Sequence, residues 1–160
     1  SIRFGIGDIF YTKRQIRQRL NIPVLGLWYQ LDNHHDGEEE LQTSLAVQSV
    51  MNQDVIFVDI INGNYAEQFY EQYTSIFSSK ENGSLQTISY PIIRQEEYDK
   101  LENANVILVI PFGVPCANQA EDIVCELQRR NCHIAGAVLT NCNYKWVKAY
   151  YNKFSTVRGK

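Results

Sequence analysis

The segment with the clearest potential for phosphate chemistry is a turn that follows an apolar stretch in the first half of the chain. Residues 55–60 read VIFVDI, and Asn62, Gly63 and Asn64 then lead into a segment with helical periodicity. In many α/β proteins a strand, a glycine turn and a helix N-terminus bind phosphate together, because backbone N–H groups and the helix dipole attract anions. This junction is therefore the first candidate for a nucleotide site.

The junction lacks the side chains that a phosphate loop normally uses. The pattern G-x-x-x-x-G-K-[ST] supplies glycines for close backbone approach, a lysine for the terminal phosphates and a hydroxyl for magnesium. Gly63 is the one glycine here, and neither a lysine nor a Ser/Thr opens the following helix. Glu67 falls in the first turn of that helix, where its carboxylate would compete with a phosphate. We therefore expect a degenerate phosphate-loop position that binds no cofactor.

Asp59, at the end of the same apolar stretch, could hold a metal ion or accept a phosphoryl group. A receiver domain that uses such an aspartate also needs an acidic pair after its first strand and a lysine at a strand end. The stretch GLWYQLD at 26–32 supplies only the distant Asp32. We therefore expect Asp59 to cap or stabilise the turn.

Cys116 is the second candidate for chemistry, in the stretch PFGVPCANQAE just before a predicted helix. The dipole at a helix N-terminus lowers the pKa of a thiol and can produce a thiolate nucleophile. The sequence places no histidine or arginine beside Cys116, so the alternative is an unreactive cysteine.

Possible metal ligands are concentrated in the stretch DNHHDGEEE at 32–40. They are Asp32, His34, His35, Asp36 and Glu38 to Glu40. The stretch is not predicted to be helical throughout, so its side chains are not expected to share one face as metal ligands at i, i+4 on a helix do. The pattern predicts a solvated acidic loop that leads into a helix, and no metal site.

Basic residues gather near the N-terminus of a chain whose net charge is -3. The residues are Lys13, Arg14, Arg17 and Arg19, on a short helix that Thr12 and Gln15 would begin as a capping box. The simplest interpretation is a solvated helix face. If a membrane span precedes the chain, the same residues would contact anionic lipid. The overall excess of acidic residues gives no general reason to expect nucleic-acid binding.

Short β-branched apolar runs alternate with amphipathic stretches of helical length, as in a parallel sheet buried on both faces. We predict strands at 23–29, 55–60, 85–90, 106–112 and 134–140, and helices at 64–77, 117–130 and 145–154. This alternation predicts a three-layer α/β fold around a mainly parallel five-stranded sheet, Rossmann-like or similar to a degenerate P-loop NTPase. Residues 1–22 would form a basic linker and helix, and residues 23–160 a single domain.

The cysteines and the hydropathy indicate the compartment. The four cysteines lie nine, seven and ten residues apart without a C-x-x-C pair, which favours a reduced, cytosolic environment. No apolar run approaches the roughly 18 residues that a membrane-spanning helix needs, so we expect the chain as given to be soluble.

Several segments resemble one protein family in order along the chain. YTKRQIRQRLNIPVLGLW at 11–28 resembles the segment after the second transmembrane helix of polysaccharide chain-length determinant proteins and their bacterial tyrosine-kinase relatives, which runs into "lgipvLGvip". EEELQTSLAVQSV and DVIFVDI resemble the helix and strand before the kinases' phosphate loop. Residues 101–141 resemble their late strand, helix and "vlGvVLN".

The chain departs from those kinases where their catalytic residues lie. At the position of the lysine-bearing Walker A loop it has INGNYAEQF, and the 45 residues between Ile60 and Val106 hold one predicted strand that ends without an aspartate. The tyrosine-rich tail of the family is echoed by Tyr144, Tyr150 and Tyr151, which also fit an amphipathic helical face. The resemblance therefore implies a shortened, degenerate relative of the kinase domain.

As an expectation from this resemblance, the chain is a non-catalytic regulatory or interaction domain. It would lie on the cytoplasmic side of the cell membrane, in a membrane-anchored protein of capsular or exopolysaccharide assembly. Its partners would be a tyrosine kinase, a transferase or another copy of itself. One alternative is a kinase-like domain that still binds ATP at the 61–66 turn, and another is a free-standing regulatory domain that uses Cys116.

Overall fold

The computed structural model describes residues 6–30, 37–51, 54–76, 86–89 and 94–149, and its centre is a five-stranded sheet. The strands are β1 (Val24–Tyr29), β2 (Val55–Asp59), β3 (Thr87–Ser89), β4 (Asn105–Pro111) and β5 (His133–Cys142). All pairings are parallel, and the spatial order is β1-β5-β4-β2-β3. The predicted α/β class and the five predicted strands are confirmed, and the sheet is parallel throughout.

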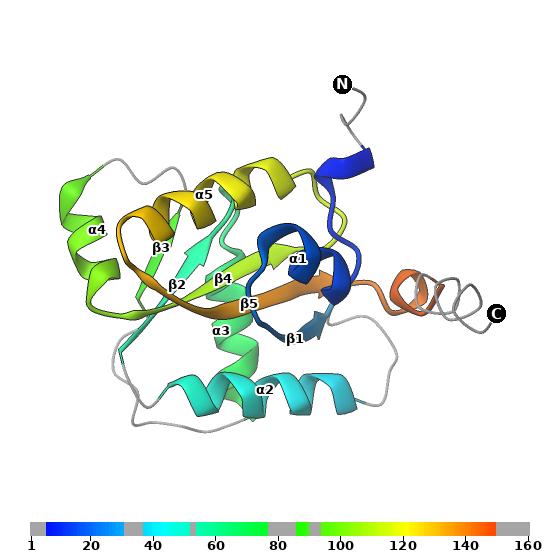
Figure 1. The fold of residues 1–160 in the computed structure, drawn as a ribbon. Helices are drawn as coiled ribbons and strands as arrows, with labels where there is room; N and C mark the ends of the chain where they lie inside the picture. Colours follow the sequence, from blue (N-terminus) through cyan, green and yellow to red (C-terminus); the bar gives the residue numbers. More distant parts are fainter. Residues whose placement is uncertain (1–5, 31–36, 52–53, 77–85, 90–93, 150–160) are drawn as a thin grey trace.

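Helices cover both faces of the sheet (Figure 1). They are the short 3-10 helix η1 (Ile6–Asp8), α1 (Lys13–Leu20), α2 (Glu38–Val50), α3 (Tyr65–Ile76), α4 (Gln95–Glu102) and α5 (Ala117–Arg129), and residues 144–149 are also helical. The result is the three-layer, Rossmann-like arrangement that the sequence predicts. None of the helices among the described residues is long and apolar enough to cross a membrane.

Successive side chains of the central strands alternate between two hydrophobic clusters. In β2, Ile56 and Val58 join one cluster, and Phe57 between them joins the other. Residues 106–110 of β4 alternate in the same way. The first cluster contains side chains of α1, α4 and α5, and the second contains side chains of α2 and α3. Burial on both faces is therefore the reason that these strands are continuously apolar.

The connections change face where the chain changes direction across the sheet. From β1 to β2 and on to β3 the chain moves toward one edge, and the connecting helices α2 and α3 pack in the second cluster. From β3 to β4 and on to β5 it moves back, and α4 and α5 pack in the first cluster. Crossovers of one hand require this exchange of faces. The reversal leaves β2 and β4 adjacent, with their following helices on opposite faces.

The N-terminal helix α1 begins as the sequence predicts and packs into the core. Thr12 Oγ1 accepts a hydrogen bond from the Gln15 N–H at 3.1 Å, and Gln15 Oε1 accepts one from the Thr12 N–H at 3.1 Å. Ile16 and Leu20 of α1 are buried in the same cluster as β1 residues. The helix is therefore part of the packed fold, although the sequence assigns residues 1–22 to a linker and helix.

A close approach between β1 and α2 fixes the position of the first turns of α2. A Cβ atom at Gly26 would lie 2.0 Å from Thr43 Oγ1, so α2 reaches this distance only because residue 26 is glycine. The same hydroxyl donates a hydrogen bond to the Leu27 carbonyl at 2.8 Å. Helix α2 is thereby held against the edge strand.

If one apolar face of the helix predicted at 145–154 held both Trp146 and Val147, both would be buried, but Val147 is buried and Trp146 is 59% exposed. Neighbouring residues on a helix point about 100° apart, so the two side chains face different directions. Residues 150–154 of that prediction lie outside the described residues.

Candidate functional site

The carboxyl ends of β2 and β4 form the position at which a doubly wound sheet usually binds its ligand. These strands are neighbours, and the helices that follow them, α3 and α5, pack on opposite faces. A crevice between two diverging connections is the topological switch point of such a fold. The degenerate phosphate-loop residues Asn62, Gly63 and Asn64 and the cysteine Cys116 belong to these two connections.

Asp59 caps the N-terminus of α3 from the end of β2. Its carboxylate is 3% exposed, and Oδ1 accepts a hydrogen bond from the Ala66 N–H at 2.9 Å. Burial raises the pKa of the Asp59 carboxyl, and hydrogen bonds from the N–H groups of Ala66 and Tyr65 oppose part of that rise. The capping role expected for Asp59 is confirmed.

The turn itself is covered by an aromatic ring. A Cβ atom at Gly63 would lie 2.5 Å from Cε2 of Tyr65, so this ring packs directly over the glycine backbone. Asn64 adopts the left-handed conformation, with φ 57°, and its carbonyl accepts the Gln68 N–H at 3.1 Å to open the helix. Glu67 is exposed in the first helical turn, as the sequence predicts. The glycine that would let a phosphate approach the backbone instead accommodates Tyr65.

A second carboxylate caps α5 in the same manner. Asp8 Oδ1 accepts a hydrogen bond from the Asn118 N–H at 2.8 Å, and the Asp8 carbonyl accepts the Cys116 N–H at 2.8 Å. Ile9 and Pro115 form an isolated antiparallel bridge beside them. The N-terminal segment therefore lies against the β4–α5 connection and places an acidic group at that helix end.

The two caps are equivalent in position. Ala66 and Asn118 are each the second residue of their helix, so each carboxylate satisfies an N–H group that a bound anion would otherwise use. The sequence suggests the Asp59 cap, because that residue ends the preceding strand. The sequence does not predict the cap by Asp8 or the packing of Tyr65 over Gly63. Asp8 acts across 110 residues of sequence, and no local pattern reports such a contact.

Cys116 does not have the environment of a reactive thiol. It occupies the N-cap position of α5 but is 1% exposed, and burial raises its pKa to about 12, with the nearby Asp8 carboxylate adding to the rise. Of the two interpretations that the sequence leaves open for Cys116, this environment favours the unreactive cysteine. The desolvation of the thiolate exceeds the effect of the helix dipole.

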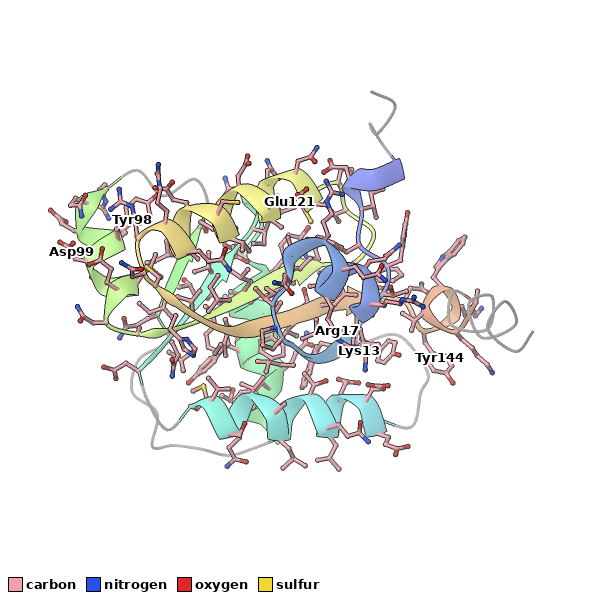
Figure 2. All side chains as sticks on the ribbon, viewed as in Figure 1. Lys13, Arg17, Tyr98, Asp99, Glu121 and Tyr144 are labelled. Atoms are coloured by element: carbon pink, nitrogen blue, oxygen red, sulfur yellow. The ribbon has the colours of Figure 1, made fainter. Side chains whose placement is uncertain are left out.

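The basic residues of α1 divide into two pairs. Arg19 donates to Glu121 at 2.5 Å and to Asn118 at 2.6 Å, and Lys13 Nζ lies 3.9 Å from Glu39. Arg14 and Arg17 are exposed, and neither is paired with an acidic side chain in the part of the chain that the structure describes. Figure 2 shows Lys13 and Arg17 on α1 and Glu121 on α5. On α1, these two arginines are therefore exposed charges that a partner could contact.

The acidic stretch is only partly within the described residues. Asp32, His34, His35 and Asp36 lie outside them, and Glu38, Glu39 and Glu40 form the first turn of α2. Over the described ranges, no group of three or more histidine, cysteine, aspartate or glutamate side chains could hold a metal ion.

Comparison of the chain with models of known protein families, with curated proteins and with solved structures gave no match.

The raised pKa of Asp59 predicts a specific pH dependence of stability. Between the ordinary pKa and the raised one, the folded state binds more protons than the unfolded state. The free energy of unfolding should therefore fall as pH rises from about 4 through the raised pKa. Asp59→Asn keeps an acceptor for the Ala66 N–H but does not titrate, so the wild-type value minus the variant value should decline over this interval and then level off.

Urea denaturation of both proteins across a pH series measures this difference. Asp59→Ala is the control for capping, and should lose about 0.5–2 kcal/mol at every pH because the N–H group loses its partner. A wild-type value that runs parallel to Asp59→Asn across the whole series would contradict the predicted titration.

The burial of the cysteines predicts one fast-reacting thiol in the folded protein. Cys125 is exposed, whereas Cys116, Cys132 and Cys142 are buried and burial raises the pKa of all three. Labelling with a maleimide at pH 7.5, followed by peptide mass analysis, should modify Cys125 first. Cys125→Ser should remove the fast phase and Cys116→Ser should leave it unchanged; a fast phase that disappears with Cys116→Ser would restore the reactive-thiol hypothesis.

Proposed function

We propose that the chain is a non-catalytic regulatory or interaction domain on the cytoplasmic side of the membrane. It belongs, in this proposal, to a membrane-anchored chain-length determinant or export protein of capsular or exopolysaccharide assembly. The single observation that supports a non-catalytic role is the capping of α3 and α5 by Asp59 and Asp8 at the switch point. The assignment to polysaccharide assembly rests on the sequence resemblance.

The caps oppose nucleotide binding in two ways. They use helix N–H groups that would otherwise bind phosphate, and they place negative charge where the phosphate would lie. Two unit charges 4 Å apart repel by about 4 kcal/mol at an effective dielectric of 20, which would cost a phosphate about a thousandfold in affinity. A Walker lysine and a magnesium ion would offset such repulsion, but the connection from Asp59 to α3 contains no lysine, serine or threonine.

A partner protein is the proposed ligand of the surface. Leu41 and Leu45 lie one turn apart on α2 and are 49% and 52% exposed, and Trp146 is also exposed. Such apolar side chains on helices are suited to contact with a kinase, a transferase or a second copy of the chain. Arg14 and Arg17 of α1 add a positive charge that would favour an anionic membrane surface.

The non-catalytic role predicts no stabilisation by ATP and magnesium. A ligand at 100 times its dissociation constant adds about 2.7 kcal/mol to the free energy of unfolding, which thermal denaturation detects as a raised midpoint. We expect no rise at millimolar ATP with excess magnesium. A rise that Glu67→Lys enlarges would instead support the alternative of ATP binding at the 61–66 turn, because this substitution exchanges repulsion for attraction beside the phosphates.

Membrane contact through α1 predicts salt-sensitive binding to anionic vesicles. Each arginine near such a surface contributes about 1 kcal/mol, so Arg14→Gln/Arg17→Gln should lower binding to phosphatidylglycerol vesicles about 30-fold at low salt. Cosedimentation measures the bound fraction. Lys100→Gln/Arg129→Gln removes the same charge from α4 and α5 and should have little effect. Equal losses in the two variants would attribute binding to net charge and contradict a role of α1.

A further inference from the structure

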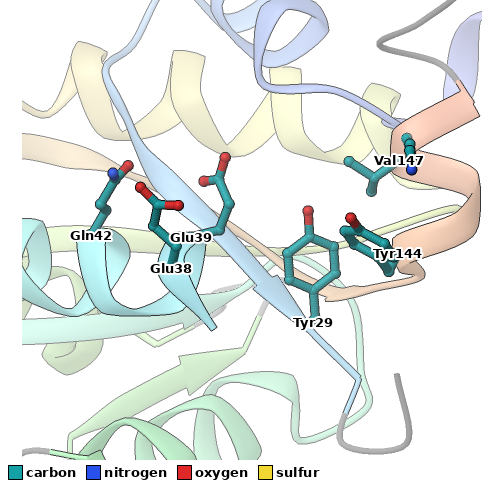
Figure 3. Close-up of a pocket in the computed structure, with 7 residues that line it drawn as sticks. Tyr29, Glu38, Glu39, Gln42, Tyr144 and Val147 are labelled. Atoms are coloured by element: carbon teal, nitrogen blue, oxygen red, sulfur yellow. The ribbon is translucent and has the colours of Figure 1, made fainter. Parts of the chain in front are cut away.

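A cavity of about 360 Å³ lies beside Tyr29 at the end of β1, where the first turns of α2 and the helix at 144–149 complete its walls (Figure 3). Glu38 and Glu39 line it, and positive charge matches both. Lys148 belongs to the same lining, and Lys13 Nζ lies 3.9 Å from Glu39. Because these charges balance, the cavity selects no ligand of one sign.

The turn between β2 and α3 contains an Asn62-Gly63 pair on the surface. Both residues are exposed, and neither forms a hydrogen bond with another residue that the structure describes. Within the described ranges, no other asparagine is followed by glycine. The fold therefore restrains neither the side-chain amide of Asn62 nor the N–H group of Gly63.

The packing of this turn requires glycine at position 63. A Cβ atom there would lie 2.5 Å from Cε2 of Tyr65, so any other residue would displace the ring. A side chain on the residue after an asparagine crowds the peptide nitrogen and slows its attack on the asparagine side chain, and glycine has no side chain. The contact that shapes the turn thus also retains a reactive pair of residues.

Asn64, two residues later, has the opposite surroundings. The residue after it is Tyr65, which has a bulky side chain, and the Tyr65 N–H group donates a hydrogen bond to the Asp59 carboxylate. The Asn64 carbonyl accepts the Gln68 N–H at 3.1 Å. A peptide nitrogen whose proton is held by a buried carboxylate is a poor nucleophile, so the fold protects Asn64 and leaves Asn62 unprotected.

We propose that Asn62 deamidates spontaneously in the folded protein through a cyclic imide. The Gly63 nitrogen loses its proton to hydroxide and attacks Cγ of Asn62. The N–Cγ bond forms, the Cγ–Nδ2 bond breaks, and the amide nitrogen takes up a proton and leaves as ammonia. Water then adds to one of the two imide carbonyls and opens the ring, which yields aspartate or isoaspartate. Nothing is oxidised or reduced, and water is the net co-reactant.

Either product adds negative charge at the switch point. The new carboxylate would lie in the turn that Asp59 precedes and Glu67 follows, so it would increase the repulsion of an anion there. Isoaspartate also inserts a methylene group into the backbone between β2 and α3. The reaction needs no partner protein and no nucleotide, so it does not depend on the proposed function.

Incubation of the folded protein at pH 8 and 37 °C, followed by peptide mass analysis, tests the site. Trypsin places Asn62 in the peptide 20–80 and the other Asn-Gly pair of the sequence, Asn82-Gly83, in the peptide 81–94. Fragmentation of the first peptide should show a mixture of aspartate and isoaspartate at Asn62. The rate should be of the same order as in the synthetic peptide IINGNYA in the same buffer, and Asn64 should remain asparagine.

Variants assign the reaction to this pair. Asn62→Gln should abolish it, because a glutamine would have to close a larger and less favourable ring, and Asn64→Gln should leave its rate unchanged. Gly63→Ala should slow it strongly, because the added methyl group crowds the nitrogen and also displaces the Tyr65 ring. Tyr65→Ala is the matched control, since it removes the ring but keeps the glycine and should retain the reaction.

Circular dichroism before and after incubation shows that each protein is still folded. An Asn62 that stays intact in the folded wild-type protein, while the synthetic peptide reacts, would overturn the proposal. Aspartate without isoaspartate, or equal conversion of Asn62 and Asn64, would overturn it as well.

Discussion

The hydrogen bond by which Asp59 caps α3 is the interaction on which the carboxyl edge of this sheet depends. A parallel sheet aims its helix N-termini at one edge, and the N–H groups there need acceptors. Here a buried carboxylate from the preceding strand is the acceptor. Asp8 caps α5 in the same way on the other face of the sheet. At the edge where related architectures bind ligands, two helix N–H groups are thus satisfied by carboxylates of the chain itself.

Patterns confined to a few neighbouring residues were predictable from the sequence. The capping box of Thr12 and Gln15, the apolar strands and the degenerate turn at Gly63 depend on side chains that are close in the chain. The surroundings of Cys116 could not be predicted from the sequence, for the opposite reason. Its burial and its raised pKa depend partly on the segment around Asp8, which no spacing near Cys116 reveals.

The pairing of charged side chains was harder to predict than the fold. The four basic residues of α1 are similar in sequence, yet Arg19 binds Glu121 of α5 while Arg14 and Arg17 remain exposed. The cavity beside Tyr29 likewise cannot be recognised in the sequence, because the residues that line it come from three elements separated by many residues. The residue types indicated which side chains could take part in binding. Tertiary contacts decide which of these side chains are paired within the fold and which stay exposed.

The pairing of β1 with β5 has a consequence for biosynthesis. β1 comes before the other described strands in the chain, but its neighbour in the described sheet is β5, so the two can pair only after the roughly hundred residues between them have been synthesised. Contacts of such long sequence separation slow folding and expose apolar edges to other chains. Helix α2 follows β1 in the chain and lies close to it at Gly26. It can therefore cover one face of β1 before β5 has been synthesised.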